Sequence, residues 1–557
     1  MLKFIWNAWW RNKERFILLL VGVLIVSTGL SYLIGTSQAN KGTVVDALQQ
    51  RWHSSYDIVV RPPNSRSVTE DLKLLEPNYM SGLDGGITRK QYETIKQMTD
   101  VEVAAPIAMI GGIYVGTPIG THTFKEQGIY RLRIKNQQDT GLNVEQYTAD
   151  FYLGAGWEPS KDATKTGLSP INVGKVPLYE ASTYEMIAGV DPEAEAKLVG
   201  LKDAVHTTAH SRYFDPDTTI TKRGDGAIQI PILLNEQEYS TVKTSYTYED
   251  VLLPLQDDSM NATVNMIEQK GGKRFLKTLK TDNPKTYTIT SQQIRKKLVT
   301  DILNGTQVAN SASEFNWISQ KPSPVSYQPL KSPFGNRWPY TYQVEPQRVE
   351  ADSLLAKRTM YRKPNPIGQT SDDWIKLDMN YIGVFNAKKL NLSKDPLTEL
   401  PMETYFPAKA QWVMDAKEQP VNPPRNVEAM DDPFDFLTKP PSVLTTLDAA
   451  FAIRGDKAIS AIRIHVKGVE TLNETSEAKL QAVAREIEDK TGLITDVTLG
   501  SSPQLALTYL PGLDGKKALG WVQQPWIKLG SSISIFEETK VGMGGVIASV
   551  IAVAIVY

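Results

Sequence analysis

The chain is 557 residues long and carries 61 basic and 62 acidic residues, which gives a formal net charge of −1. This length exceeds what a single hydrophobic core usually serves, so we expect two to four domains. No basic excess exists to release counterions, and this excludes nucleic acid as a partner on bulk charge. The chain has no cysteine, which excludes thiol catalysis and cysteine metal sites. The absence of cysteine also fits a large exported domain in an organism that does not rely on disulfides outside the cell, as in many Gram-positive bacteria.

The first long apolar segment covers residues 16–34 and contains no charged residue. As a helix it would reach roughly 30 Å, the thickness of the hydrocarbon core of a bilayer. Basic residues precede it, and they favour a cytoplasmic N-terminus. We therefore expect a transmembrane helix that places the rest of the chain outside the cell. The alternative is a cleaved secretory signal ending at Ser37-Gln38-Ala39, although the apolar segment is longer than a usual signal core.

Residues 1–15 combine tryptophans with basic residues at helical spacing. Tryptophan prefers the headgroup layer, so we expect an interfacial helix on the cytoplasmic surface. The helix either anchors the chain only or also contacts a cytoplasmic partner. Its candidate interaction residues are Trp6, Trp9, Trp10, Arg11, Lys13 and Arg15.

Residues 35–56 are expected to continue the membrane helix outward as a stalk. The β-branched stretch Tyr56–Val60 then predicts a strand. A helix is predicted over Thr88–Met98, because Thr88 and Gln91 match a capping box. The apolar residues 101–115 predict a strand, or two strands with a bulge, since Pro106 and a glycine pair interrupt them.

The signal is weaker in residues 117–442, which we interpret as a large inserted α+β domain. Strand-like and helical pieces alternate there, and no internal repeat is present. The expected strands are 129–134, 227–234 and 287–290, the expected helices are 192–198 and 292–303, and the expected proline-rich loops are 321–347 and 407–441.

Regular patterns return near the C-terminus. Residues 458–466 alternate as a strand, with Arg463 and His465 on its polar side. An amphipathic helix is predicted over 475–490, with Gly492 as its cap, followed by a strand over 493–499. We expect this β-α-β unit to pair with residues 88–115 in one sheet. Residues 541–557 are again uncharged and predict the start of a second membrane span.

Motifs for common chemistry are absent or weak. No Walker A sequence, nucleophile elbow or zinc-protease motif is present. His206 and His210 are four residues apart, but a metal site needs about three ligands in fixed geometry. The acidic stretch Asp431–Asp435 matches no calcium loop and is expected to form a surface turn. His465 is expected to be exposed. We predict no catalytic residue, metal or cofactor. A chain with 62 acidic residues nevertheless always offers candidate carboxylate pairs for glycoside hydrolysis.

The order of these features resembles permease subunits of MacB/FtsX-type ABC transporters. The resemblance covers about the first 115 and the last 100 residues, and no single motif in it is diagnostic. Besides the basic, tryptophan-rich start before residues 16–34, the matching segments are Ser55–Val60, Gly86–Thr88, Val101–Pro106, Ala461–Ile464, Thr491–Leu493, Gly500–Pro503 and Trp526–Gly530.

The resemblance implies an α+β extracellular domain flanked by transmembrane helices. That domain would be a split porter-like β-α-β domain with a large insertion. The implied regions are 1–15 (interfacial helix), 16–34 (first span), 35–56 (stalk), 57–116 and 443–535 (the two porter-like parts), 117–442 (insertion) and 536–557 (stalk and start of the second span, truncated).

The implied function is mechanical: a separate cytoplasmic ATPase would move the extracellular domain, for export or extracellular signalling. The chain itself would not be an enzyme. Expected partners are the membrane, the ATPase subunit, a second permease in a homo- or heterodimer, and an accessory extracellular protein. Alternatives are a membrane-anchored extracellular binding or sensory protein and an exported cell-wall hydrolase. A hydrolase would need two facing carboxylates about 5–10 Å apart in a cleft.

Overall fold

The computed structural model describes residues 13–14, 28, 55–141, 144–158, 165–215, 218–254, 259–306, 317–348, 359–392, 405–469, 474–513, 515 and 517–529. The chain forms two compact units, one of Met1–His53 with Val469–Glu477 and one of Ser54–Gly468 with Ala478–Tyr557. In the first unit, Lys13, Glu14, Thr28 and the start of helix α10 are described as helical. All that follows concerns the second unit, apart from that helix.

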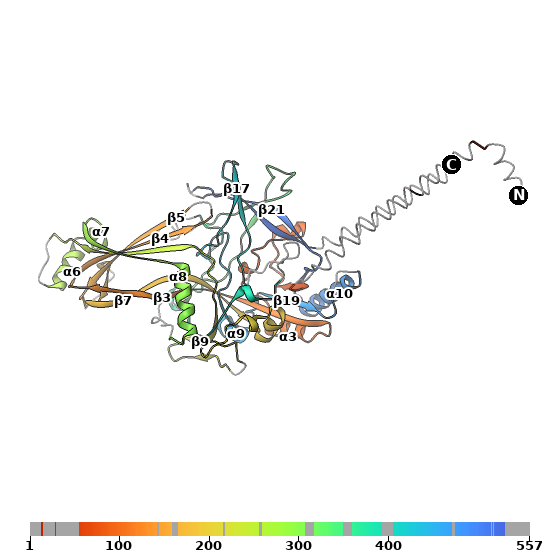
Figure 1. The fold of residues 1–557 in the computed structure, drawn as a ribbon, viewed down its shortest axis with the longest axis horizontal. Coiled ribbons are helices and arrows are strands. Elements are labelled where there is room, and N and C mark those ends of the chain that lie inside the picture. The colour runs from red at the N-terminus through yellow and green to blue at the C-terminus, as the bar shows by residue number, and fades with distance from the viewer. Residues whose placement is uncertain are drawn as a thin grey trace. The chain divides into compact units, whose positions relative to one another are not determined.

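Segments far apart in the sequence meet in one four-stranded arrangement (Figure 1). Strand β1 (Ile58–Arg61) lies between β19 (Ala461–Val466) and β20 (Ile494–Val497) and is antiparallel to both. Strand β3 (Val101–Phe124) pairs with the other side of β19. Helix α3 (Arg89–Lys96) connects β1 to β3, and α10 (Glu474–Thr491) connects β19 to β20.

This β-α-β-β-α-β order with two interleaved split β-α-β units is the ferredoxin-like arrangement. We call these four strands and α3 the terminal module. The prediction that the C-terminal β-α-β unit shares a sheet with residues 88–115 is confirmed, because Ala461 pairs with Ile107 and Ile464 with Ala104. The whole stretch between β3 and β19 therefore leaves the module and returns to it.

The terminal module is one edge of a larger, ten-stranded sheet. Beyond β3 the sheet continues as β7, β18, β9, β15 and β12, and β8 pairs with β9. A core on this sheet joins Val59, Ala105 and Ala461 of the module to Leu233 and Leu444 farther along. The added strands are β7 (Gly174–Val190), β18 (Val443–Thr446), β9 (Ile228–Asn235), β15 (Ile375–Phe385), β12 (Trp317–Ile318) and β8 (Thr221–Lys222).

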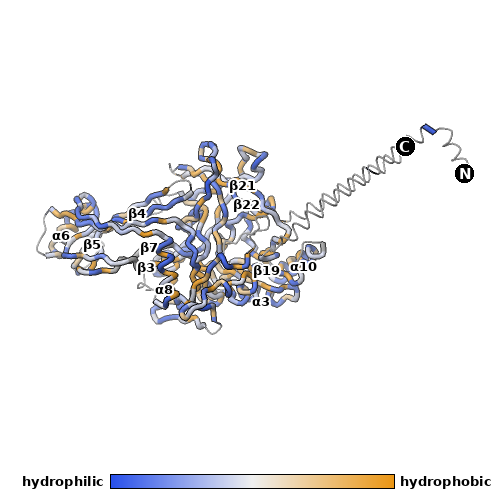
Figure 2. The backbone as a smooth tube through the Cα atoms, viewed as in Figure 1, coloured by the Kyte–Doolittle hydropathy of each residue, from blue (hydrophilic) through white to orange (hydrophobic). Residues whose placement is uncertain are grey.

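Strands β3 and β7 extend past the ten-stranded sheet as a long two-stranded ribbon (Figure 1). Phe124 at the end of β3 packs with Tyr246 and Tyr248 of a separate five-stranded sheet. Much of β4 in this sheet is hydrophilic, whereas hydrophobic residues gather around β19 and α3 (Figure 2). Its strands are β11 (Thr281–Thr290), β10 (Val242–Val251), β4 (Gly128–Asp139), β5 (Val144–Ala155) and β6 (Leu168–Ile171).

A third, seven-stranded sheet combines middle and C-terminal residues. Its core is aromatic: the ring of Tyr342 stacks on Trp526 at 4.9 Å, and Tyr327 meets Trp526 edge-on at 5.3 Å. Its strands are β13 (Tyr327–Pro329), β14 (Tyr340–Val344), β21 (Ser502–Leu510), β22 (Gly520–Lys528), β16 (Gln411–Met414) and β17 (Pro420–Asn426), and β2 (Leu74–Leu75) pairs with β22.

The remaining described helices are short and lie between strands. They are α4 (Pro192–Val199), α5 (Leu201–Ala204), α6 (Met260–Gln269), α7 (Lys273–Leu276), α8 (Ser291–Leu303) and α9 (Leu447–Arg454), with 3-10 turns η1 (Val68–Leu72), η2 (Met80–Gly82), η5 (Ser371–Asp373) and η6 (Ala387–Lys389).

Several local predictions are confirmed. Thr88 caps α3 in a full capping box with Gln91, and Gly492 adopts the left-handed φ of +67° expected after α10. The register of β3 against β7 shifts between Met109 and Gly111, which is the expected bulge. Pro106 does not break β3: it pairs with Ile462 of β19, whereas pairing with β7 begins only at Ile107.

The predicted fold class is wrong. The described residues are dominated by strands in three sheets, not by a mixed α+β domain between membrane helices. Both segments expected as loops contribute strands: residues 321–347 contain β13 and β14, and residues 407–441 contain β16 and β17. Their prolines were misleading, since β17 lies at the edge of its sheet, where proline is tolerated.

Within the described part of the chain, no helix combines the length and apolar composition needed to cross a bilayer. The description of this chain as a transmembrane transporter is corrected accordingly: its described part is a β-rich body. The predicted spans 16–34 (Thr28 apart) and 536–557 lie outside the described residues, as do most of 1–15 and nearly all of the stalk at 35–56. Strands from residues 117–442 enter all three sheets.

Candidate functional site

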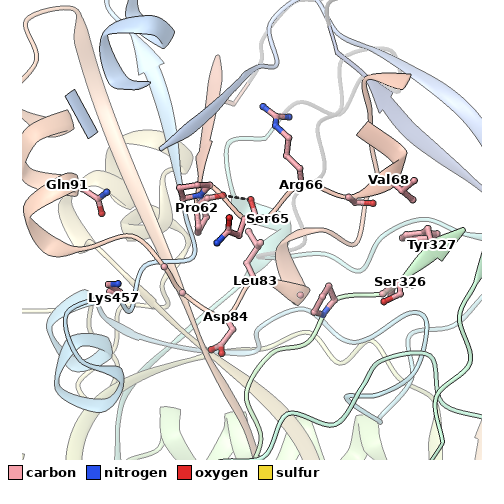
Figure 3. Close-up of a pocket in the computed structure, with 18 of the residues that line it drawn as sticks. Pro62, Ser65, Arg66, Val68, Leu83, Asp84, Gln91, Ser326, Tyr327 and Lys457 are labelled. Atoms are coloured by element: carbon pink, nitrogen blue, oxygen red, sulfur yellow. Dashed lines mark hydrogen bonds between the residues drawn. The ribbon is translucent and has the colours of Figure 1, made fainter. Parts of the chain in front are cut away.

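An open cleft of about 1010 Å³ lies between the terminal module and the seven-stranded sheet. Its first wall consists of residues 62–68 and 82–86 with Thr88, Gln91 and Lys457, all from loops or the helix start at one end of the module. Its second wall is the segment Pro324–Tyr327, which leads into edge strand β13. Figure 3 shows Arg66, Lys457, Asp84 and Tyr327 placed around this opening.

A buried arginine holds the first wall in place. Arg61, the last residue of β1, is 1% exposed and binds both Asp496 of the module and Glu70 of η1 at 2.6 Å. Its Nη1 also donates to the carbonyl of Ser65. Ser65 closes a turn by donating its hydroxyl to the Pro62 carbonyl at 2.8 Å (Figure 3). The conformation of residues 62–67 thus depends on this ion-pair cluster.

A second buried arginine fixes the other wall. The guanidinium of Arg362 donates to the carbonyl of Ser323 at 2.9 Å and to the carbonyl of Asp435 at 3.0 Å. Residue Ser323 directly precedes the wall, and Val325 forms a β-bridge with Arg362. Neutral carbonyl groups, rather than carboxylates, therefore accept these hydrogen bonds of Arg362.

An unusual carboxyl group lies behind the second wall. Tyr327 donates its hydroxyl to Glu76 Oε2 at 3.2 Å, and the backbone N–H of Asn78 donates to the same oxygen at 2.6 Å. Burial raises the pKa of Glu76 to about 7, although the charge of Arg362 opposes this shift. The group therefore titrates near neutral pH directly behind a residue that lines the cleft.

The walls meet closely at one point. A Cβ placed on Gly82 would lie 2.5 Å from Pro324 Cα, so only glycine permits this contact. Gly85 adopts a φ of +66° and packs against the Lys457 carbonyl, where a Cβ would lie 2.3 Å away. These glycines explain how three loops can line one cleft.

The charged side chains that line the cleft are two cations, Arg66 and Lys457, and one carboxylate, Asp84. Its only lining carboxylate among the described residues, Asp84, is already paired with Arg454 and lies 4.0 Å from Lys321. Arg66 is 46% exposed and shares Glu70 and Asp496 with Arg61. Lys457 is exposed, and no ion pair of it occurs among the described residues. The cleft also lacks the facing carboxylate pair that a glycoside hydrolase requires.

A second charged cluster lies inside the protein, and none of its members lines the cleft. We call it the buried cluster: Glu185, Glu238, Arg295, Asp431 and Lys439. Arg295 binds Glu185 at 2.6 Å and Glu238 at 3.1 Å, and Lys439 binds Asp431 at 2.6 Å. Against the effect of burial, Lys439 and Arg295 lower the pKa of Glu238 to about 2, whereas burial raises that of Asp431 to about 6.

The site residues expected from the sequence fall largely outside the described part. Trp6, Trp9, Trp10, Arg11 and Arg15 are not described. Lys13 is described, and it is helical and exposed. The prediction that these residues contact an ATPase therefore stays a prediction.

The histidines and aspartates that the sequence offered as weaker candidate site residues lie in environments that differ from the predicted ones. His206 pairs with Glu236, and no group of three potential ligands that could hold a metal occurs among the described residues. His465 is not simply exposed, because it pairs with buried Asp57 at 2.9 Å, a hydrogen bond that raises its pKa. Asp431 and Asp432 do not form a surface turn: Asp431 belongs to the buried cluster, and Asp432 is 6% exposed.

Sequence reasoning missed the cleft entirely. Its walls are short loops from four parts of the chain, and only the fold brings them together. The available signal was the density of turn residues at Pro62-Pro63, Gly85-Gly86 and Pro322–Pro324. Such residues mark loops, but they do not show which loops meet.

No family model matches the chain, and no characterised protein or solved structure shows significant similarity to it. The resemblance to MacB/FtsX-type proteins consequently has no independent support and stays a prediction.

Proposed function

We propose that this chain is the moving, non-catalytic subunit of an ATPase-driven assembly of the MacB/FtsX type. A separate cytoplasmic ATPase hydrolyses ATP, and the β-rich body works on the outer side of a cell membrane beside a second copy or a related chain. The body changes the shape of its cleft during the ATPase cycle and so captures or releases a ligand.

The position of the cleft relative to the chain ends carries this proposal. The first wall follows β1, the first strand of the described body, whereas the second wall belongs to the sheet that contains β22, the last strand. A displacement of the segment before β1 relative to the segment after β22 would therefore be felt at the cleft. The two walls are held by different buried arginines, Arg61 and Arg362, and β2, which lies between the two stretches of the first wall, pairs with β22.

The first test is co-purification. The tagged full chain is expressed with its neighbouring genes and extracted in mild detergent. We expect a Walker-motif ATPase to co-purify stoichiometrically, and we expect deletion of residues 6–15 to abolish this association. Purification of the chain alone, from extracts in which other membrane complexes survive, would overturn the proposal.

A disulfide staple tests the movement itself. The chain has no native cysteine, so Gly82→Cys with Pro324→Cys adds a single possible disulfide. The ideal Cβ of Gly82 lies 2.9 Å from Pro324 Cβ and 2.5 Å from Pro324 Cα, closer than the about 3.5–4.5 Å that separates the Cβ atoms of a disulfide, so the two backbones must move apart to form it, and thermal unfolding has to show that the variant is folded. We expect oxidation to slow ATP hydrolysis by the complex severalfold and reduction to restore it.

The matched control places a staple within one sheet. The hydroxyls of Thr247 and Thr286 lie 2.9 Å apart across β10 and β11, and Thr247→Cys with Thr286→Cys should leave the ATPase rate unchanged. Equal rates for the fully oxidised cleft staple and its control would rule out a relay through the cleft.

The second candidate function is a surface-bound binding or sensory protein without an ATPase. The cleft is the observation that favours it, since a ligand site needs no motor. This function becomes the better one if the chain purifies alone and still binds a ligand in the cleft.

A further inference from the structure

We propose that Glu76 and Arg362 form a proton-controlled switch that sets the position of the second wall of the cleft. While Glu76 is protonated, Arg362 holds the wall through its hydrogen bond to Ser323. When Glu76 loses its proton, the guanidinium turns to the new carboxylate and releases the wall. The inference rests on the proposed function only in treating the cleft as the working part of the body, and it requires no ATPase.

Two groups that can carry opposite charges interact in the interior without forming an ion pair. Glu76 is 5% exposed and Arg362 is 1% exposed. The charge of Arg362 acts on Glu76, yet no ion pair of either group occurs within the described part of the chain. Buried charged groups are normally paired. An unpaired carboxyl group beside an unpaired guanidinium therefore fits a Glu76 that carries a proton.

The hydrogen bonds of Glu76 match this neutral state. Both donors, the hydroxyl of Tyr327 and the N–H of Asn78, reach the same oxygen, Oε2. The other oxygen, Oε1, accepts no hydrogen bond from the residues that the structure describes, so it is free to carry the proton.

Arg362 connects this carboxyl group to the wall. Its guanidinium donates to the carbonyl of Ser323, which directly precedes the second wall, Pro324–Tyr327. Its other hydrogen bonds are to the carbonyls of Asp435 at 3.0 Å and Phe436 at 3.4 Å. A carboxylate binds a guanidinium more strongly than a neutral carbonyl does. Ionised Glu76 therefore competes with the wall for the same cation.

The second wall is the part that yields when this hydrogen bond is lost. It leads into β13, a strand of three residues that lies at the edge of the seven-stranded sheet and pairs only with β14. A short edge strand is held by few backbone hydrogen bonds, so it moves before the central strands of its sheet do.

The charges around Glu76 place the switch near neutral pH. Burial raises the pKa of Glu76 to about 7, against the charge of Arg362 and the hydrogen bond from Tyr327. The remaining charged neighbour, Glu70, disfavours ionisation of Glu76 but is itself paired with Arg61 at 2.6 Å. The wall is consequently held below pH 7 and released above it.

The experiment measures the distance between the two walls in the purified full chain by double electron–electron resonance. The chain has no native cysteine, so Ser326→Cys and Lys457→Cys accept one nitroxide label each. Both positions are exposed, and Figure 3 shows them on opposite sides of the opening. We expect one narrow distance distribution at pH 5.5 and a longer, broader one at pH 8.5, with the midpoint of the change near pH 7.

Two variants and a control pair identify the titrating group. Glu76→Gln cannot ionise, so its distribution should stay narrow at both pH values. Tyr327→Phe removes a hydrogen bond that lowers the pKa of Glu76, so it should raise the midpoint by about 0.5–1 pH unit, the equivalent of one net hydrogen bond. Labels at Thr148→Cys and Thr288→Cys, exposed positions in one row of the five-stranded sheet, should show no pH dependence.

Four results would overturn the inference. They are a wall distance that is the same at both pH values, a change that persists in Glu76→Gln, a midpoint that Tyr327→Phe leaves unmoved, or an equal change in the control pair. Thermal unfolding shows that each variant is folded. Because no ATPase is present in this assay, its failure leaves the co-purification result intact, and a missing ATPase leaves the pH response intact.

Discussion

The cleft and the buried cluster are both rich in charge, yet their charges serve different purposes. In the buried cluster, every member has an oppositely charged partner within 3.5 Å, and four of the five side chains come from loops or a helix. In the cleft, apolar surface and the cation Lys457 face solvent without a partner among the described residues.

This difference shows why a perturbed pKa alone is a poor guide to function. Burial raises the pKa of Asp431 to about 6 within a cluster that lines no cleft, because structural ion-pair networks also shift pKa values. The cleft, in contrast, is lined by Lys457, an exposed side chain that forms no ion pair within the described part of the chain. The predictions below measure how much each group contributes to stability.

The largest effect is expected for Arg295→Met in the buried cluster. This change leaves Glu185 and Glu238 buried with only Lys439 to neutralise them, and removing one partner of a buried pair costs about 3–5 kcal/mol. Denaturant unfolding measures the loss. The matched control is Arg223→Met, whose side chain is 54% exposed and pairs with Asp378 of β15, and it should cost far less because solvent screens the pair. Equal losses for the two variants would contradict a structural role for the cluster.

Glu76 is an intermediate case, buried like the cluster but short of cations. Its pKa is raised from 4.5 to about 7 in the folded protein, so its contribution to stability is fully present below pH 4.5 and is lost as the pH rises through 7. The loss amounts to about 3 kcal/mol at most, since one pKa unit equals 1.36 kcal/mol.

Glu76→Gln removes this dependence, because its amide oxygen can still accept from Tyr327 and from the N–H of Asn78. We expect the variant to be more stable than the wild type at pH 8 and similar to it at pH 4.5. Unfolding curves recorded across this pH range provide the measurement. Parallel pH profiles for the two proteins would show that Glu76 does not titrate in this range.

Local order in this protein could be predicted from sequence where short-range chemistry decides it. The capping box at Thr88, the glycine cap at Gly492 and the bulge near Gly111 each depend on a few neighbouring residues. The pairing of β3 with β19 was also predictable, because two clean apolar strands flank the same long stretch.

The rest depended on long-range packing that no local pattern shows. Arg463 occupies the polar side of an alternating strand, yet it is 1% exposed because Glu195 reaches it from α4 at 2.6 Å. Prolines in β17 concealed a strand that is tolerated only at a sheet edge. The cleft follows from where two sheets place their loops, so it could not be inferred before the fold.

A smaller effect is expected for His465→Gln on β19. The hydrogen bond to Asp57 raises the pKa of this histidine, so its extra stabilisation is present below pH 6.5 and is lost as the pH rises through the raised value. The ring is 36% exposed and solvent screens the pair, so the effect should stay below about 1 kcal/mol. Comparing the unfolding free energy at pH 5.5 and pH 8.5 tests this: the variant should lose stability only at the lower pH.

The smallest effect, and the sharpest contrast with Arg295, is expected for Lys457→Met in the cleft. The side chain is exposed and forms no ion pair among the described residues, so its loss should change the unfolding free energy by no more than about 0.5 kcal/mol. A large loss of stability would mean that Lys457 serves the fold, and the cleft would then differ from the buried cluster only in its exposure.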